Sequence, residues 1–318
     1  MLWKLTEGRV FATDITNAAR TSLFNISNLK WDDDLIKIFG LEGIKLPDIK
    51  NNADDYGTTS LFGGEIKISG MAGDQQAALF GQACFDTGEV KSTYGTGCFL
   101  ILNTGTKILR SNNKLLSTVG YKIGGDVTYA LEGSIFVSGS LIQWLRDKMK
   151  FFSNALETEK LAKSANKNSE VVIIPSFTGL GAPHWKPDLR GAIHGLSLET
   201  SKEDIILAAL EAICFQTKDL VTALKNDGAK IKSIKIDGGM ATNNFFGQTL
   251  SNILSMKVFK PRNIESTSLG AAYLAGIGSN YINLSELKDV WKVDKLFEPK
   301  KSYEKKYLKY LDSLESLS

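Results

Sequence analysis

The sequence predicts an α/β protein whose strands and helices are joined by glycine-rich turns, and three stretches carry this prediction. A short strand ending at Ser69 leads through Gly70 and Gly73 into a helix. Two β-rich runs flank a Gly-Thr-Gly turn, and a strand ending at Asp237 leads through two glycines into another helix. With 318 residues, 43% of them hydrophobic, we expect two domains, each able to bury a core.

Composition excludes several classes of function. The net charge is only +3 and no lysine or arginine cluster stands out, so nothing supports nucleic-acid binding. No apolar run is long enough for a membrane span. The three cysteines show neither metal-site nor disulfide spacing and fit a reducing cytosol, so we expect a cytoplasmic protein. These cysteines are Cys84, Cys98 and Cys214.

Asp74 lies where the first of these strands gives way to a helix over residues 75–80. The free N–H groups and the positive end of the helix dipole favour an ionised carboxylate there. Such a group could accept a proton or lie beside a metal ion. An aspartate at this place is also a common helix N-cap, and the sequence leaves both interpretations open.

The runs 90–94 and 98–103 form a hairpin around Gly95, Thr96 and Gly97. Without bulky side chains, the backbone N–H groups of this turn could approach a phosphate closely. A carboxylate and a phosphate-sized turn, about twenty residues apart, suggest phosphoryl transfer.

The other elements follow from local patterns. Residues 2–8 resemble the end of a helix, and 31–40 an amphipathic helix with acidic residues in its first turn. Ser201 and Asp204 have capping-box spacing and open a buried helix to about residue 225. The loop 177–191 could be a folded-back surface loop or a site. We also expect a hairpin at 120–132, helices at 135–150, 240–244 and 265–276, strands at 171–175 and 231–237, and a closing helix in 291–318.

Several stretches, in their order along the chain, resemble the FGGY carbohydrate kinase family, in particular its members that act on glycerol. They are residues 73–82, 94–99, 177–185, 237–239 with Asn243 and Asn244, and 269–276. The resemblance implies an actin-like ATPase fold of two ribonuclease H-like lobes. Residues 1–84 would be the remainder of an incomplete N-terminal lobe, and residues 85–318 the C-terminal lobe.

The same resemblance implies ATP-dependent phosphorylation of glycerol to sn-glycerol 3-phosphate. Asp74 would be the general base and would bind glycerol together with Gln75 and Phe99. Mg²⁺ would be held by phosphate oxygens and partly through water, without a dedicated protein ligand. The residues expected to bind the nucleotide are Thr96 and Gly97 at the phosphates, Gly139 and Gln143 along the site, and Gly239 and Asn243 at the adenosine.

The sequence also departs from the family. An Asp-x-Gly-Thr-Thr strand and an Arg-Glu pair are expected before Asp74 and do not occur. We therefore expect a missing N-terminal segment, a separate chain that supplies it, or a homo-oligomer. A non-catalytic remnant that only binds nucleotide remains an alternative. Another FGGY sugar kinase is less favoured, because such kinases generally lack the Gly-Thr-Gly-Cys-Phe run. Glu65 replaces an arginine that binds fructose 1,6-bisphosphate in some members, so we expect no such inhibition.

Overall fold

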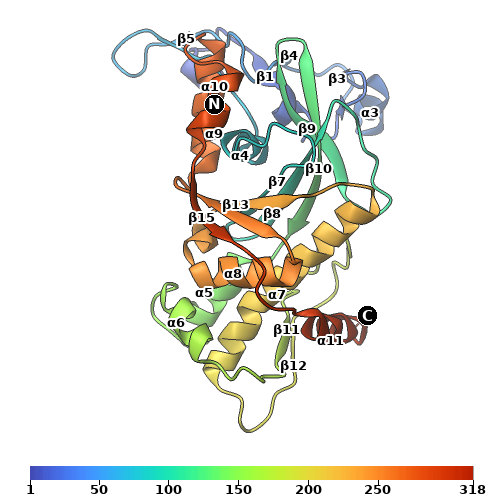
Figure 1. Ribbon diagram of the computed structural model, residues 1–318. Coiled ribbons are helices and arrows are strands. Elements are labelled where there is room, and N and C mark those ends of the chain that lie inside the picture. Colours follow the sequence, from blue (N-terminus) through green and yellow to red (C-terminus); the bar gives the residue numbers. More distant parts are fainter. Residues whose placement is uncertain (318) are drawn as a thin grey trace.

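A seven-stranded mixed sheet forms the centre of the computed structural model, which describes residues 1–317 (Figure 1). Its strand order is β15-β14-β13-β7-β8-β10-β9. Strand β13 runs parallel to both β7 and β14, and the other neighbours are antiparallel. In chain order the strands are β7 (Val90–Tyr94), β8 (Cys98–Gly105), β9 (Leu116–Ile123), β10 (Asp126–Ile135), β13 (Ser233–Asp237), β14 (Lys257–Pro261) and β15 (Val293–Phe297).

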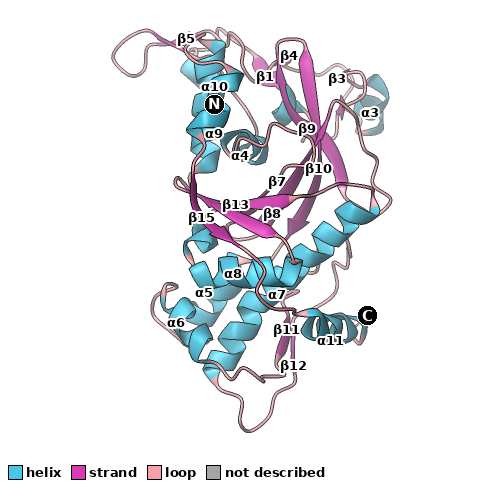
Figure 2. Cartoon of the chain, viewed as in Figure 1, coloured by secondary structure: helices cyan, strands magenta, loops and turns pink. Residues whose placement is uncertain are grey.

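Helices cover both faces of this sheet (Figure 2). On β8, Leu100 and Leu102 belong to the large core with α7 (Lys202–Asn226) and α8 (Asn244–Leu254), while Ile101 belongs to a second core with α4 (Asp74–Gly81). Alternate residues of a strand point to opposite faces, so this β8 pattern places α4 opposite α7 and α8. The long apolar run of α7 is explained by its burial in the larger core.

Helix α9 (Ser266–Gly278) packs directly on α4, although almost two hundred residues separate them. A Cβ atom at Gly81 would lie 2.0 Å from the carbonyl oxygen of Ser266, and one at Gly270 only 1.7 Å from that of Ala77. Only glycine permits this approach, which explains why the helix expected at 265–276 is rich in small residues. Figure 1 shows α9 and α10 (Leu284–Val290) near α4, and Leu287 of α10 shares a core with Leu79 and Phe80 of α4. The lobe boundary expected between residues 84 and 85 stays a prediction. The last residue of the expected C-terminal lobe, Ser318, lies outside the described residues.

Smaller elements complete the fold around the sheet. Four two-stranded sheets pair β1 with β4, β2 with β3, β5 with β6 and β11 with β12. Their bounds are β1 (Ala12–Asp14), β2 (Phe24–Asn25), β3 (Lys30–Trp31), β4 (Asp48–Lys50), β5 (Thr58–Thr59), β6 (Ile66–Lys67), β11 (Val172–Ile174) and β12 (Ala192–His194). The remaining helices are α1 (Leu2–Leu5), α2 (Ile15–Ala18), α3 (Asp33–Ile38), α5 (Gly139–Asp147), α6 (Glu157–Ser164), α11 (Glu304–Glu315) and the 3₁₀ helix η1 (Gly239–Thr242). No helix among residues 1–317 is long and apolar enough to span a membrane.

Most of the expected elements are confirmed, but some boundaries are wrong. Both hairpins form, and Ser201 and Asp204 make the capping box at the start of α7. The helix expected from residue 135 begins only at Gly139, because Ile135 pairs with Cys98 as the last residue of β10. Strands β14 and β15 were not expected from the local pattern, although the closing helix α11 is confirmed.

Candidate functional site

Two glycine-rich turns meet at one edge of the central sheet. Strands β7 and β13 are parallel neighbours, with Thr93 opposite Asp237, so their carboxyl ends reach the same edge. In open α/β sheets ligands bind outside such carboxyl ends. The two turns pack tightly, since a Cβ atom at Gly238 would lie 2.5 Å from the carbonyl oxygen of Tyr94. Gly238 also has a φ of +83°, which favours glycine.

The start of helix α5 holds the turn formed by Gly95, Thr96 and Gly97. The backbone N–H of Gly139 donates to the carbonyl oxygen of Gly95 at 2.9 Å, and that of Ser140 to the carbonyl oxygen of Thr96 at 3.0 Å. These bonds occupy the carbonyl groups of the turn. The N–H groups of Thr96 and Gly97 have no hydrogen-bond partner within residues 1–317. Free backbone donors in a glycine turn suit an anion such as a phosphate.

A cavity of about 340 Å³ opens beside these turns. Its volume lies within the range of small-molecule sites. Gly239 contributes open backbone, because a Cβ atom there would meet no atom within 4 Å. Gly97 lies outside the lining, but the other five residues expected at the nucleotide line this one cavity: Thr96, Gly139, Gln143, Gly239 and Asn243. We call it the nucleotide cavity after this expectation.

Helix α6 forms a wall of this nucleotide cavity that sequence reasoning missed. The sequence of residues 150–168 is polar with a helical pattern and carries no sign of a site, yet Thr158 and Glu159 line the cavity. The Asn243 side chain donates to Thr158 Oγ1 at 3.1 Å and accepts from the N–H of Phe246 at 3.0 Å. Glu159 accepts from the N–H of Asn244 at 3.1 Å. These bonds fix the start of α8, and no local pattern in the sequence reports them.

Asp74 is the first residue of α4, and the N-cap is Gly73, so the N-cap interpretation is wrong. Its side chain is exposed and accepts a hydrogen bond from the N–H of Gln75 at 2.8 Å. The side chain of Gln75 is held in place by Lys91, because Gln75 Oε1 accepts from Lys91 Nζ at 2.5 Å. Gln75 Nε2 also donates to Asp74 Oδ2 at 3.3 Å, so both carboxylate oxygens accept from Gln75. Because the Asp74 side chain is exposed and each oxygen has a further lone pair, the carboxylate can still accept from a ligand at the start of the helix.

Lys91 is fully buried in β7 and was not singled out from the sequence. Burial lowers the pKa of its ammonium group, while the charges of Asp237 and other carboxylates oppose that shift. Its Nζ also donates to Thr93 Oγ1 at 2.9 Å, and Thr93 faces Phe99 across the strand pair. Cross-strand partners share one face, which brings Phe99 to the side of the sheet that carries Gln75 and Lys91. One feature of the sequence could have indicated Lys91: it is a lysine within a strand whose other residues are mostly buried.

Within residues 1–317 no group of three or more histidine, cysteine, aspartate or glutamate side chains is placed to hold a metal ion. Asp237 is buried, and its Oδ1 has no hydrogen-bond partner among the described residues, while its Oδ2 accepts from Gln82 at 2.8 Å. Single carboxylates fit Mg²⁺, which usually binds through substrate phosphates and water with few protein ligands.

None of the residues of the loop 177–191, all of them described, lines the nucleotide cavity. His184 Nε2 lies 3.0 Å from Asp219 Oδ2, and Trp185 donates to the carbonyl oxygen of Lys114 at 2.8 Å. Gly181 lies against β10, since a Cβ atom there would be 2.6 Å from the carbonyl oxygen of Ser134. These contacts support the interpretation of the loop as a folded-back structural segment.

Two family models match most of this chain. Residues 90–279 match the C-terminal domain of the FGGY family of carbohydrate kinases, and residues 1–81 match its N-terminal domain. The chain belongs to the FGGY family of carbohydrate kinases. The FGGY chain is 54% identical over 302 residues to a glycerol kinase of Marinomonas sp., covering 94% of the chain and 61% of that relative. It thus spans about three fifths of the length of the curated relatives it matches.

Solved structures agree on the fold. A glycerol kinase of Plasmodium falciparum, crystallised with ADP, has a TM-score of 0.91 and 37% identity to the FGGY chain, covering 99% of it and 65% of that protein. A ligand-bound xylulose kinase of Lactobacillus acidophilus has a TM-score of 0.83 at 23% identity, covering 99% and 64% of the two chains, and shows the fold alone. The FGGY chain has the actin-like ATPase fold, which confirms the fold expected from the resemblance.

Proposed function

We propose that this chain contributes the nucleotide site and the general base of an ATP-dependent glycerol kinase that produces sn-glycerol 3-phosphate. The observation that carries the proposal is the cavity of about 340 Å³, which five residues expected at the nucleotide line together. The identity to glycerol kinases supports glycerol as the substrate over a larger sugar. The three cysteines, which lack disulfide spacing, support a cytoplasmic location. Assembly into an oligomer stays a prediction.

The proposed reaction is in-line phosphoryl transfer. A glycerol hydroxyl oxygen forms a bond to the γ-phosphorus of ATP. The bond between that phosphorus and the oxygen that bridges it to the β-phosphate breaks, and ADP leaves with this oxygen. Asp74 accepts the proton of the attacking hydroxyl, and Gln75 and Phe99 orient the glycerol. The free N–H groups of Thr96 and Gly97 would donate to phosphate oxygens. Mg²⁺, held by those oxygens and water, would supply charge neutralisation when bound.

The proposal is tested by measuring ADP release from ATP with and without glycerol, using the 318-residue chain. We expect glycerol-dependent release that Asp74→Asn lowers by about a hundredfold or more, because general-base catalysis typically contributes that much. The matched control is Asp126→Asn in the exposed β9–β10 turn, which should keep full activity.

Two other outcomes would count against the proposal. Equal activity in Asp74→Asn and the wild type would remove Asp74 from the base role. Binding of ADP without any glycerol-dependent turnover would show that this chain is not a kinase by itself, and would favour a non-catalytic remnant or a nucleotide-binding lobe that needs a separate N-terminal chain.

A further inference from the structure

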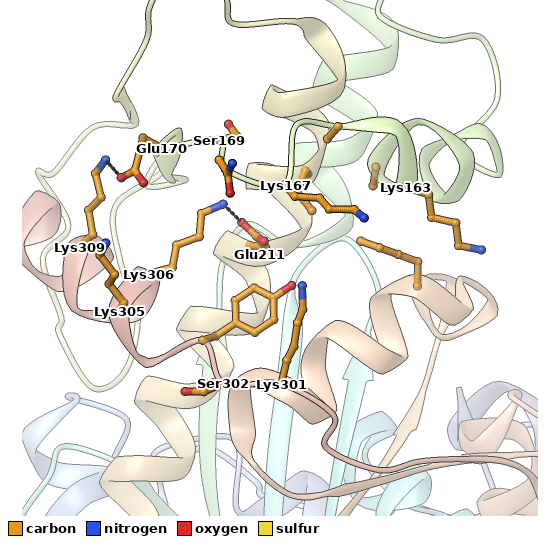
Figure 3. Close-up of a pocket in the computed structure, with 16 residues that line it drawn as sticks. Lys163, Lys167, Ser169, Glu170, Glu211, Lys301, Ser302, Lys305, Lys306 and Lys309 are labelled. Atoms are coloured by element: carbon orange, nitrogen blue, oxygen red, sulfur yellow. Dashed lines mark hydrogen bonds and ion pairs between the residues drawn. The ribbon is translucent and has the colours of Figure 1, made fainter.

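A second cavity of about 630 Å³ lies beside the nucleotide cavity. It is formed by the end of α6, the loop that follows, one side of α7, and residues 301–309 at the start of α11. Helix α7 contributes to both cavities, with Leu210 in the nucleotide cavity and Leu207 and Glu211 in the second one. Figure 3 shows this second cavity, which we call the lysine pocket.

Positive charge dominates the lysine pocket. Among the described residues, the lining of the pocket holds six lysines and two carboxylates, Glu170 and Glu211, and one of the lysines, Lys163, pairs with Glu159 outside the lining. Figure 3 shows Lys309 and Glu170 on one side, Lys306 and Glu211 near the middle, and Lys163 and Lys167 on the other side. The six lysines are Lys163, Lys167, Lys301, Lys305, Lys306 and Lys309.

Ion pairs neutralise only part of this charge. Lys306 lies 2.5 Å from the buried Glu211, and Lys309 lies 2.7 Å from Glu170. Within residues 1–317, neither Lys167 nor Lys305 has a carboxylate oxygen within 4.0 Å. Like charges gathered around one cavity repel each other, and an anion with several negative charges would remove that repulsion.

The rest of the lining suits a phosphate-bearing ligand of small-molecule size. Ser169 and Ser302 add hydroxyl donors, and Leu207 and Phe245 add apolar surface. The volume of the pocket lies within the usual range for small-molecule sites. Lysine ammonium groups bind phosphate as compact charges and need no fixed fork geometry, so several flexible lysines can adapt to one ligand.

We propose that the lysine pocket binds a small phosphate-bearing polyanion and that this binding weakens nucleotide binding through Lys163 and Glu159. The binding itself is independent of the function proposed above, whereas the linkage rests on the proposed nucleotide cavity. No residue of the lysine pocket belongs to the set expected to contact ATP or glycerol.

The linkage follows from a side chain pair between the two cavities. Lys163 Nζ lies 2.6 Å from Glu159 Oε1, and Glu159 lines the nucleotide cavity. A polyanion in the lysine pocket attracts the Lys163 ammonium and leaves Glu159 less neutralised. With less neutralisation by Lys163, the Glu159 carboxylate makes the electrostatic potential in the nucleotide cavity more negative, which opposes binding of the negatively charged nucleotide. Glu159 also accepts from the N–H of Asn244, so a shift of its carboxylate would disturb the start of α8. By thermodynamic reciprocity, nucleotide binding must lower the affinity of the lysine pocket for the polyanion by the same factor.

Binding is tested with inorganic pyrophosphate as the probe, titrated into the 318-residue chain by calorimetry at low ionic strength. We expect the double substitution Lys167→Gln with Lys305→Gln to weaken pyrophosphate binding roughly tenfold, since it removes two unpaired charges. The matched control replaces Lys225 and Lys232 with glutamine, because both are exposed and lie outside the lysine pocket. Equal affinity in the pocket variant and the control, with unchanged thermal unfolding in both, would overturn the site.

The linkage is tested by measuring ADP affinity with and without saturating pyrophosphate. We expect pyrophosphate to weaken ADP binding in the wild type and to have a smaller effect in Lys163→Gln and in the double variant. Direct competition at the phosphate turn would persist equally in every variant. An effect of the same size in the wild type and both variants would therefore overturn the linkage.

Discussion

Gly139→Ala tests how tightly helix α5 holds the proposed phosphate turn. The added Cβ atom would lie 2.5 Å from the carbonyl oxygen of Gly95, whereas ordinary contacts begin at 3.4 Å. The Cβ atom is fixed to the backbone of Gly139 and the oxygen belongs to the backbone of Gly95, so no side-chain rotation can relieve the contact. Relief requires α5 to move from the turn, which stretches the 2.9 Å hydrogen bond from Gly139 to the same oxygen.

The cost can be estimated from these contacts. Overpacking of this kind costs about 1–3 kcal/mol, and a weakened hydrogen bond adds about 1 kcal/mol. The better helix propensity of alanine returns up to about 1 kcal/mol. We therefore expect a free energy of unfolding lower by about 2 kcal/mol, measured by urea denaturation, and weaker ADP binding measured by calorimetry.

Gly239→Ala is the matched control for this estimate. No atom lies within 4 Å of a Cβ at Gly239, so its stability should change by no more than about 0.5 kcal/mol. If Gly139→Ala were as stable as Gly239→Ala and bound ADP like the wild type, the tight contact between α5 and the turn would not hold in solution.

Three further predictions concern buried charge and helix capping. Lys91→Met should lower the free energy of unfolding by about 2 kcal/mol and raise the KM for glycerol, because Gln75 Oε1 and Thr93 Oγ1 lose the buried donor that they share; normal unfolding and kinetics would contradict this. Burial raises the pKa of Glu211 above 4.5, with Lys306 opposing the rise, so its contribution to stability is present below pH 4.5 and lost as pH rises through the folded-state pKa. Glu211→Gln should flatten that part of the pH profile measured by urea unfolding, and parallel profiles would refute it. Ser201→Ala should cost about 1 kcal/mol through loss of the capping box, with an unchanged urea midpoint as the contrary result.

Local spacing was enough to predict the elements that carry the site. The hairpin around Gly95 to Gly97, the strand ending at Asp237 and the capping box of α7 each depend on neighbours a few residues away. Such short-range patterns are written directly in the sequence. The fold type came instead from the resemblance to a family, since no local pattern specifies an actin-like ATPase.

What sequence reasoning missed depends on contacts between distant segments. The lining of the nucleotide cavity by Glu159 requires α6 to pack beside the start of α8, and the support of Gln75 by Lys91 requires α4 to lie on β7. The start of α5 was misplaced because residues up to Ile135 pair with β8 instead of forming a helix. Tertiary pairing of this kind overrides local propensity.

The measurement that tests the central claim most directly is the ADP affinity of the 318-residue chain, determined by calorimetry for the wild type, Gly239→Leu and Gly125→Leu. Gly239 lines the cavity and has open space beside it, whereas Gly125 has open space in an exposed hairpin turn. We expect the wild type and Gly125→Leu to bind ADP equally and Gly239→Leu to bind it at least about tenfold more weakly, a loss of about 1.4 kcal/mol. Equal ADP affinity in all three proteins would show that the nucleotide does not occupy this cavity.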